Sequence, residues 1–256
     1  MPLKSLVRPV RVFGPDHGGQ GGAAPKVSGS VTRLRAVAAL IGAQSYLEIG
    51  VHLGLTFHAL DLPRMDGVDP DFLFDPADHA RDGRRYFPVT SDAFFAGPLV
   101  SGPYDLIFLD GLHVFTQTFR DFCASQALAH AGTVWLIDDT GPNDIFSAIP
   151  DQDRALALRE AHGLTARAWN GDVFKTVFAL HDFFPSFDCR TIVDPAGRPQ
   201  TLVIRRPRGA FAPRWNDLEA VSRLGYLDYL QYRDLMQECG FEAAMDWLRA
   251  ADLPKA

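Results

Sequence analysis

The sequence predicts an α/β protein with a doubly wound, mostly parallel sheet of seven strands and an antiparallel strand at one edge. Short apolar runs alternate with helix-length segments between Val31 and Ile137. The runs at 104–109 and 132–137 are almost continuously apolar, which is typical of parallel strands covered on both faces. Right-handed crossovers then place helices on both sides of the sheet.

The expected elements follow in order along the chain. A first helix, capped by Ser30 or Thr32, runs to about Gly42. Strands are expected near 47–51, 67–68, 86–90, 104–109 and 132–137, and helices from 56, at 116–129 and at 151–161. Residues 172–180 and 201–204 are expected to form an antiparallel pair at one edge, with Lys175 exposed on a strand. Residues 215–251 are expected to form one or two amphipathic helices.

Composition excludes several classes of function. The formal net charge of -6 argues against a nucleic-acid-binding protein. The three cysteines are scattered along the chain, which is typical of free thiols in a reducing compartment. With no apolar run of 18 residues and no apolar signal segment, we expect a cytoplasmic protein that does not bind membranes.

The two ends of the chain differ in character. Residues 1–30 are rich in proline and glycine and are expected to form a flexible arm; a lid that orders over a bound ligand is the alternative. Residues 207–256 are expected to form a helical extension that packs on the main domain. The alternative for this extension is a surface for a homo-oligomer or a substrate lid.

A glycine turn follows the first predicted strand. Glu48, Gly50 and Gly54 form the pattern E-x-G-x-x-x-G, and Asp69 ends the next strand. In an open α/β sheet, ligands bind at the carboxyl ends of strands, and an acidic residue at the second tip suits a ribose diol. The third glycine of a dinucleotide-binding turn is missing, since Thr56 and Phe57 stand in that region, so a nicotinamide cofactor is disfavoured.

Three aspartates end neighbouring strands. Asp110 follows the fourth strand, and Asp138 and Asp139 follow the fifth. Single aspartates at strand ends are more often turn or helix caps. Three at adjacent tips would repel one another unless a cation were present. They therefore predict a divalent ion with oxygen ligands, Mg²⁺ first and Mn²⁺ or Ca²⁺ next.

A histidine lies close to the same tips. His113 follows Asp110 by three positions, and an imidazole can act as a general base near neutral pH. An equally good interpretation is that it caps the next helix or bonds a neighbouring aspartate.

These stretches resemble the class I S-adenosylmethionine-dependent methyltransferases over about residues 31–206. Leu47–Thr56 resembles their first motif, Gly67–Pro70 their second, and Asp105–His113 the fourth-strand motif of a subgroup that carries D-G-x-H. The resemblance implies a Rossmann-like catalytic domain that binds S-adenosylmethionine. The cofactor-binding residues that it implies are Glu48, Gly50, His52, Gly54, Thr56, Asp69, Ser91, Asp92 and Asp110.

The resemblance also implies a role for several of these residues. Gly50 and Gly54 would let the backbone approach the methionine part of the cofactor, above Glu48, which would hold loop amides or the cofactor's amino group. Asp69 would bind the ribose hydroxyls, and Asp110 would lie near the sulfonium. The adenine would lie beside Ser91 and Asp92.

The reaction type is predicted from the aspartate pair Asp138-Asp139. Asp138-Asp139 is similar to the pair of macrocin-type sugar O-methyltransferases and to the Asp-Asn pair of catechol O-methyltransferase, and with Asp110 it would complete their metal triad. Many D-G-x-H members have histidine in place of Asp138. The expected function is metal-assisted O-methylation of a small-molecule hydroxyl, with His113 or a metal-bound water as base. The alternatives are metal-free catalysis by His113, a related hydroxylase-type reaction, or a non-catalytic cofactor-binding or interaction module.

Overall fold

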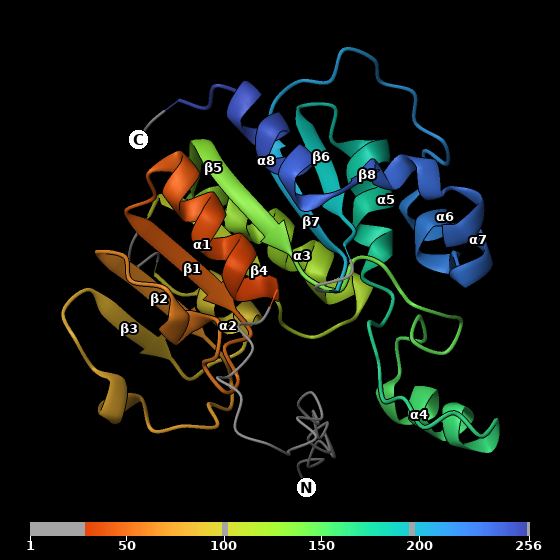
Figure 1. Ribbon diagram of the computed structural model, residues 1–256, viewed down its shortest axis with the longest axis horizontal. Helices are drawn as coiled ribbons and strands as arrows, with labels where there is room; N and C mark the ends of the chain where they lie inside the picture. Colours follow the sequence, from red (N-terminus) through yellow and green to blue (C-terminus); the bar gives the residue numbers. More distant parts are fainter. Residues whose placement is uncertain (1–28, 99–101, 195–197, 255–256) are drawn as a thin grey trace, which may run out of the picture.

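The computed structural model describes residues 29–98, 102–194 and 198–254. Its sheet has eight strands in the order β3-β2-β1-β4-β5-β7-β6-β8 (Figure 1). The strands are β1 (Ser45–Ile49), β2 (Arg64–Val68), β3 (Arg84–Phe87), β4 (Tyr104–Leu109), β5 (Ala129–Ile137), β6 (Phe187–Ile192), β7 (Gln200–Arg205) and β8 (Glu238–Cys239).

Strands β1 to β5 run parallel to one another, and β7 is antiparallel to both β5 and β6. The predicted doubly wound, mostly parallel sheet is therefore confirmed, with one strand more than expected. The antiparallel strand is not at the edge, because β6 and β8 lie beyond it, and β8 runs parallel to β6.

Helices cover both faces of the sheet (Figure 1). Apolar residues of α1 and α8 pack on one face, and those of α2, α3 and α5 on the other. A third cluster joins α3 and α5 to α6 and α7. The helices are α1 (Gly29–Ile41), α2 (Ser91–Ala96), α3 (Phe115–Ser125), α4 (Gln152–Ala161), α5 (Phe174–Phe183), α6 (Leu218–Arg223), α7 (Tyr226–Gln231) and α8 (Phe241–Ala250).

The expected strand at 172–180 is wrong, because Phe174–Phe183 forms the helix α5. Every residue from Phe174 to Leu180 is buried, so the segment lacks the polar face that reveals a helix in a sequence. Lys175 is accordingly 6% exposed inside α5, and not on an exposed strand. The strand that pairs with β7 is β6, further along the chain.

The expected helix after Thr56 is also wrong. Only a 3-10 turn, Phe57–Ala59, lies between β1 and β2. The connection spans residues 50–63 and ends in Pro63, which disfavours helical backbone at the preceding residue. The third strand ends at Phe87, and Thr90 caps α2, whose first turn contains Ser91 and Asp92.

The C-terminal extension contributes more than helices. Its strand β8 joins the sheet, and α8 packs in the same core cluster as α1. The domain boundaries and the oligomer surface stay predictions, and the expected arm lies outside the described residues except for Gly29 and Ser30, which begin α1. No helix in the described part of the chain is long and apolar enough to cross a membrane.

Candidate active site

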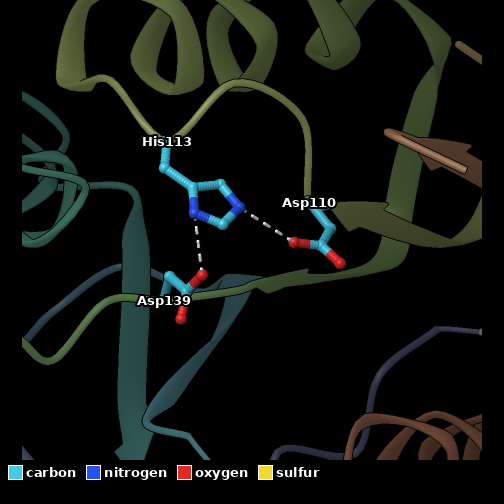
Figure 2. A group of neighbouring side chains, drawn as sticks. All are labelled: Asp110, His113 and Asp139. Atoms are coloured by element: carbon cyan, nitrogen blue, oxygen red, sulfur yellow. Dashed lines mark ion pairs between the residues drawn. The ribbon is translucent and has the colours of Figure 1, made fainter. Parts of the chain in front are cut away.

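The carboxyl ends of β4 and β5 bring three polar side chains together. Leu109 and Ile137 are register partners, so the residues after them, Asp110 and Asp138, begin at neighbouring tips. Figure 2 shows the imidazole of His113 between the carboxylates of Asp110 and Asp139. His113 Nε2 lies 3.4 Å from Asp110 Oδ1, and its Nδ1 lies 3.0 Å from Asp139 Oδ2.

Asp139 is the buried centre of this group. It is fully buried and has left-handed backbone, with φ of 55°. Asn170 Nδ2 donates to its Oδ1 over 2.7 Å, and Arg198 Nη1 lies 3.0 Å from its Oδ2. Burial alone would raise the pKa of this carboxyl, but the charges of His113 and Arg198 hold it below its usual value. Asp139 is therefore an ionised carboxylate aimed at the imidazole.

Asp138 points to different partners. Its Oδ1 accepts from Gln200 Nε2 over 2.8 Å and from the backbone of Asp139 over 2.9 Å. Burial, followed by the charges of Asp110 and Asp139, raises its pKa well above the usual value. Asp138 is 8% exposed and does not join the group around the imidazole in the described part of the chain.

The segment before α5 packs against both the ring and the backbone of His113. The ring of Trp169 stacks on the imidazole, with centroids 5.0 Å apart and planes 22° apart. Gly171 has φ of 61°, and a Cβ there would lie 1.7 Å from the His113 carbonyl oxygen. Burial lowers the pKa of the imidazole, but Asp139 and Asp110 outweigh it and raise the pKa well above its usual value. The ring is thus held between Trp169 and its two neighbouring carboxylates, which favour its protonated form.

The glycine turn after β1 lies against the same edge of the sheet. Gly50 has φ of 92°, and a Cβ there would lie 2.0 Å from the carbonyl oxygen of Asp110. The lack of a side chain at Gly50 therefore lets the ends of β1 and β4 meet. His52 and Gly54 are also left-handed, with φ of 49° and 73°. The amides of His52 and Asp71 donate to the two oxygens of Asp69, each over 2.8 Å.

Glu48 lies beneath this turn and is fully buried. Tyr46 and Thr56 donate their hydroxyls to its two oxygens, each over 2.5 Å. Burial raises the pKa of Glu48 to about 8, although these hydrogen bonds oppose the shift. Thr56 is thereby tied to β1, and the described residues place no loop amide on the Glu48 carboxylate.

Ser91 and Asp92 connect α2 to α3. Gln117 Nε2 donates to Ser91 Oγ over 3.1 Å and to Asp92 Oδ1 over 3.2 Å. Arg120 pairs with Asp92 at 2.7 Å. Their roles beside the adenine stay predictions.

The residues fit a divalent ion poorly as they stand. Among the described residues, the group that could hold a metal ion, with ligand atoms within 4.8 Å of one another, is Asp110, His113 and Asp139, so the metal triad expected with Asp138 is not confirmed. Both ring nitrogens of His113 already face carboxylates, and Arg198 pairs with Asp139. A hard ion such as Mg²⁺ prefers oxygen ligands, and here Arg198 already pairs with one oxygen of Asp139.

Sequence reasoning missed Trp169, Asn170 and Arg198. They lie 30, 31 and 59 positions after Asp139, in connections without regular structure. No motif of their own marks them. The only signal was Gly171-Asp172 beside them, which sequence reasoning placed at the start of a strand.

No protein-family model and no curated protein matches this chain. Among solved structures, it is similar to cofactor-bound Rv0187 from MTB, with 18% identity, a TM-score of 0.47, and coverage of 73% of this chain and 83% of that chain. It is also similar to the O-methyltransferase TomG from Streptomyces achromogenes in complex with SAM (19%, 0.42, 73% and 82%). A third is the O-methyltransferase from Bacillus cereus in complex with SAH (15%, 0.44, 72% and 83%). All three TM-scores are below 0.5, and all three structures are less than 20% identical to this chain.

Proposed function

We propose that this chain is an S-adenosylmethionine-dependent methyltransferase that methylates a hydroxyl group of a small molecule, with His113 as the proton acceptor. The observation that carries the proposal is the imidazole held between Asp110 and Asp139, at the same sheet edge as the glycine turn. An imidazole fixed by a buried carboxylate is an arrangement that serves general-base catalysis.

The residues at the tips of β1 and β2 fit the cofactor. Each oxygen of Asp69 accepts one backbone amide, and a carboxylate has about four acceptor positions, so both oxygens can still accept a ribose hydroxyl. The side chain of Asp110 is 26% exposed and would lie near the positive sulfur. When bound, the cofactor supplies an electrophilic methyl group.

His113 and Asp139 would handle the acceptor's proton. His113 accepts a proton only when it is neutral, and its pKa is raised because Asp139 and Asp110 outweigh the effect of burial. The rate is therefore expected to rise with pH above the ordinary imidazole value of about 6.5. Asp139 would orient the ring and stabilise the imidazolium that forms, while Asn170 and Arg198 keep Asp139 in place.

The proposal is tested by release of S-adenosylhomocysteine from S-adenosylmethionine with a panel of catechols, other phenols and sugars, with and without excess EDTA. We expect turnover of at least one acceptor class, undiminished by EDTA. Loss of turnover in EDTA and its recovery with Mg²⁺ would support the metal-assisted mechanism instead. Mass spectrometry of the product distinguishes a gained methyl group from a gained hydroxyl group.

A non-catalytic module is the remaining alternative. Calorimetry that detects S-adenosylhomocysteine binding, together with no turnover on any acceptor, would favour that alternative over an enzyme.

A further inference from the structure

A buried ion pair contacts the backbone two residues after His113. Lys175 Nζ donates to Asp172 Oδ2 over 2.8 Å, and each residue is 6% exposed. The other oxygen of Asp172, Oδ1, accepts from the backbone amide of Phe115 over 2.6 Å. Lys175 Nζ also donates to the carbonyl oxygen of Ser222 in α6 over 2.8 Å. One carboxylate and one ammonium thus connect three separate segments.

The hydrogen bond from Phe115 makes Asp172 the cap of α3. The residue at the N-cap position of α3, Val114, has no side chain that can accept a hydrogen bond from the first turn. The first amides of a helix have no partner within the helix, so one must come from elsewhere. Asp172 supplies it from a segment 57 positions away. Since Phe115 follows His113 by two positions, the start of α3 fixes where the imidazole lies.

The neighbours of Asp172 act on the same loop. Trp169 stacks on the His113 ring, Asn170 donates to Asp139, and Gly171 packs against the His113 carbonyl. Four consecutive residues therefore contact either the base, its partner carboxylate or the helix that follows the base. Asp172 is the member of this set that carries a charge, and Lys175 is the cation that balances it.

We propose that Asp172 and Lys175 are positioning residues for His113. Through its hydrogen bond to the Ser222 carbonyl, Lys175 makes this positioning depend on where α6 packs. The inference rests on the proposed role of His113 as proton acceptor. A buried ion pair is weak evidence for stability, because apolar residues of similar volume often serve as well or better. Here the carboxylate is needed as a cap, and the ammonium holds that carboxylate in place.

Lys175→Met leaves the Asp172 carboxylate buried without its cation. The carboxylate is then expected to turn away from Phe115 toward water, which shifts His113. We expect kcat to fall about 10- to 100-fold, as for a small misplacement of a catalytic group, while KM for S-adenosylmethionine stays within about twofold. S-adenosylhomocysteine release by the acceptor that the wild type turns over best measures both constants.

The double variant Lys175→Met/Asp172→Asn separates positioning from general stability. In this variant the amide oxygen of the new side chain at position 172 can still accept from the Phe115 amide, and no buried charge is left unpaired. We therefore expect its kcat to be several-fold higher than that of Lys175→Met alone. A double variant with the same or lower kcat would overturn the proposal.

Asp182 offers a matched control in the same helix. Its buried carboxylate accepts from the backbone amides of Arg214, Trp215 and Asn216 over 2.6–2.8 Å. Within the part of the chain that the structure describes, its hydrogen-bond partners lie outside the His113 loop. Asp182→Asn is expected to lower the thermal midpoint and leave kcat within about twofold of the wild type. An equal loss of kcat in Asp182→Asn and Lys175→Met would show that general destabilisation lowers kcat, and it would overturn the proposal.

Hydrogen exchange tests the role of the ion pair without any need for methyl transfer. By hydrogen exchange, the Phe115 amide should lose protection in Lys175→Met and keep it in the double variant and in Asp182→Asn. If no acceptor is methylated, this result still decides whether the ion pair orders the His113 loop. Unchanged protection of the Phe115 amide in Lys175→Met would overturn the proposal.

Discussion

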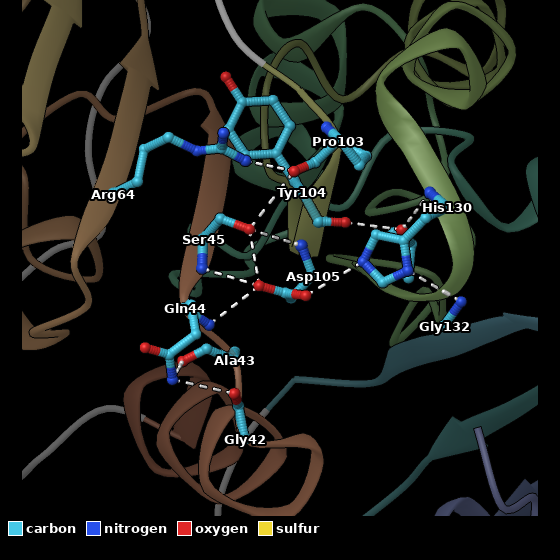
Figure 3. A network of polar contacts seen from close by, with 11 residues as sticks. Gly42, Ala43, Gln44, Ser45, Arg64, Pro103, Tyr104, Asp105, His130 and Gly132 are labelled. Carbon is cyan, nitrogen blue, oxygen red and sulfur yellow. Dashed lines mark hydrogen bonds and ion pairs between the residues drawn. The ribbon is translucent and has the colours of Figure 1, made fainter. Parts of the chain in front are cut away.

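An aspartate–histidine contact lies at the amino edge of the sheet, where the parallel strands begin, and another at the carboxyl edge, where they end. The two contacts differ in how well their polar groups are hydrogen-bonded. At the amino edge, Asp105 Oδ2 accepts from the amides of Gln44 and Ser45, each over 2.9 Å, and from Ser45 Oγ over 2.7 Å (Figure 3). His130 Nε2 lies 3.0 Å from Asp105 Oδ1, and the Gly132 amide donates to His130 Nδ1. Both polar groups are satisfied.

The carboxyl edge is not satisfied in the same way. Several buried side-chain atoms of the described residues lack a hydrogen bond of acceptable geometry. Two of them, His113 Nδ1 and Asn170 Oδ1, lie at this edge, although Nδ1 faces Asp139, and two others, Arg64 Nε and Arg84 Nε, belong to residues at the start of β2 and β3. Asp139 has strained left-handed backbone, and the pKa of Asp138 is raised by burial and by neighbouring carboxylates. Strain and unmet hydrogen-bonding needs collect at sites of function, whereas satisfied networks stabilise. Under the proposed function, an aspartate–histidine pair serves stability at the amino edge and proton transfer at the carboxyl edge.

The largest expected difference between the edges is in catalysis. His113→Asn removes the proposed base, and kcat should fall by about a thousandfold, while S-adenosylhomocysteine binding measured by calorimetry changes little. His130→Asn is the matched control at the amino edge. It loses two hydrogen bonds and should lower the free energy of unfolding by about 1–2 kcal/mol without changing kcat. Equal losses of kcat would contradict the assignment of His113.

The second difference is in stability. Asp105→Ala leaves the Gln44 and Ser45 amides without their acceptor, and urea unfolding at pH 7 should show a loss of about 2–3 kcal/mol. Methyl transfer by the folded variant should be unchanged. The control is Asp61→Ala, whose carboxylate is 84% exposed in its pair with Arg81, so the change should stay below about 0.5 kcal/mol. Similar stabilities of the two variants would refute the structural role of the Asp105 network.

The third and smallest difference is in pH dependence. Burial raises the pKa of Asp105, but hydrogen bonds from Ser45 and Gln44 outweigh it and hold the pKa below its usual value. Its stabilisation is therefore present above the unfolded value of about 3.9 and is lost as pH falls through the folded pKa. The pKa of His113 is raised, so its stabilisation is present below about 6.5 and is lost as pH rises through the folded pKa.

Thermal midpoints as a function of pH measure these two contributions. Asp105→Asn should reduce the loss of stability in acid, and His113→Asn should reduce the loss at alkaline pH. A wild-type profile that is flat above neutral pH would contradict the raised pKa of His113.

Much of the fold could be predicted because the central strands are buried on both faces. The strand at 104–109 has the expected bounds, and its pairing with β5 places Asp110 near the residues that follow β5, as expected. The same reasoning failed for α5, because a helix buried on all sides has no polar face to set it apart from a strand.

The site could be predicted only in part. Asp110, His113 and Asp139 come together because adjacent strand tips must meet. Asp138 turns to Gln200, whereas Asp139, with left-handed backbone, turns to His113, and no local pattern predicts this difference. Asn170 and Arg198 reach Asp139 from distant connections, and long-range contacts of irregular segments leave no periodic signal.

The proposal that the carboxyl edge binds the cofactor can be decided by isothermal titration of S-adenosylhomocysteine into the wild type, Asp69→Asn and Asp105→Asn. We expect wild-type binding with a Kd below about 1 mM, in the range typical of enzyme ligands. Asp69→Asn should weaken it at least about tenfold, because one oxygen that accepts at the tip of β2 is lost. Asp105→Asn, at the opposite edge, should leave the Kd unchanged. No binding to the folded wild type at about 1 mM ligand, or equal weakening in both variants, would contradict the assignment of the site.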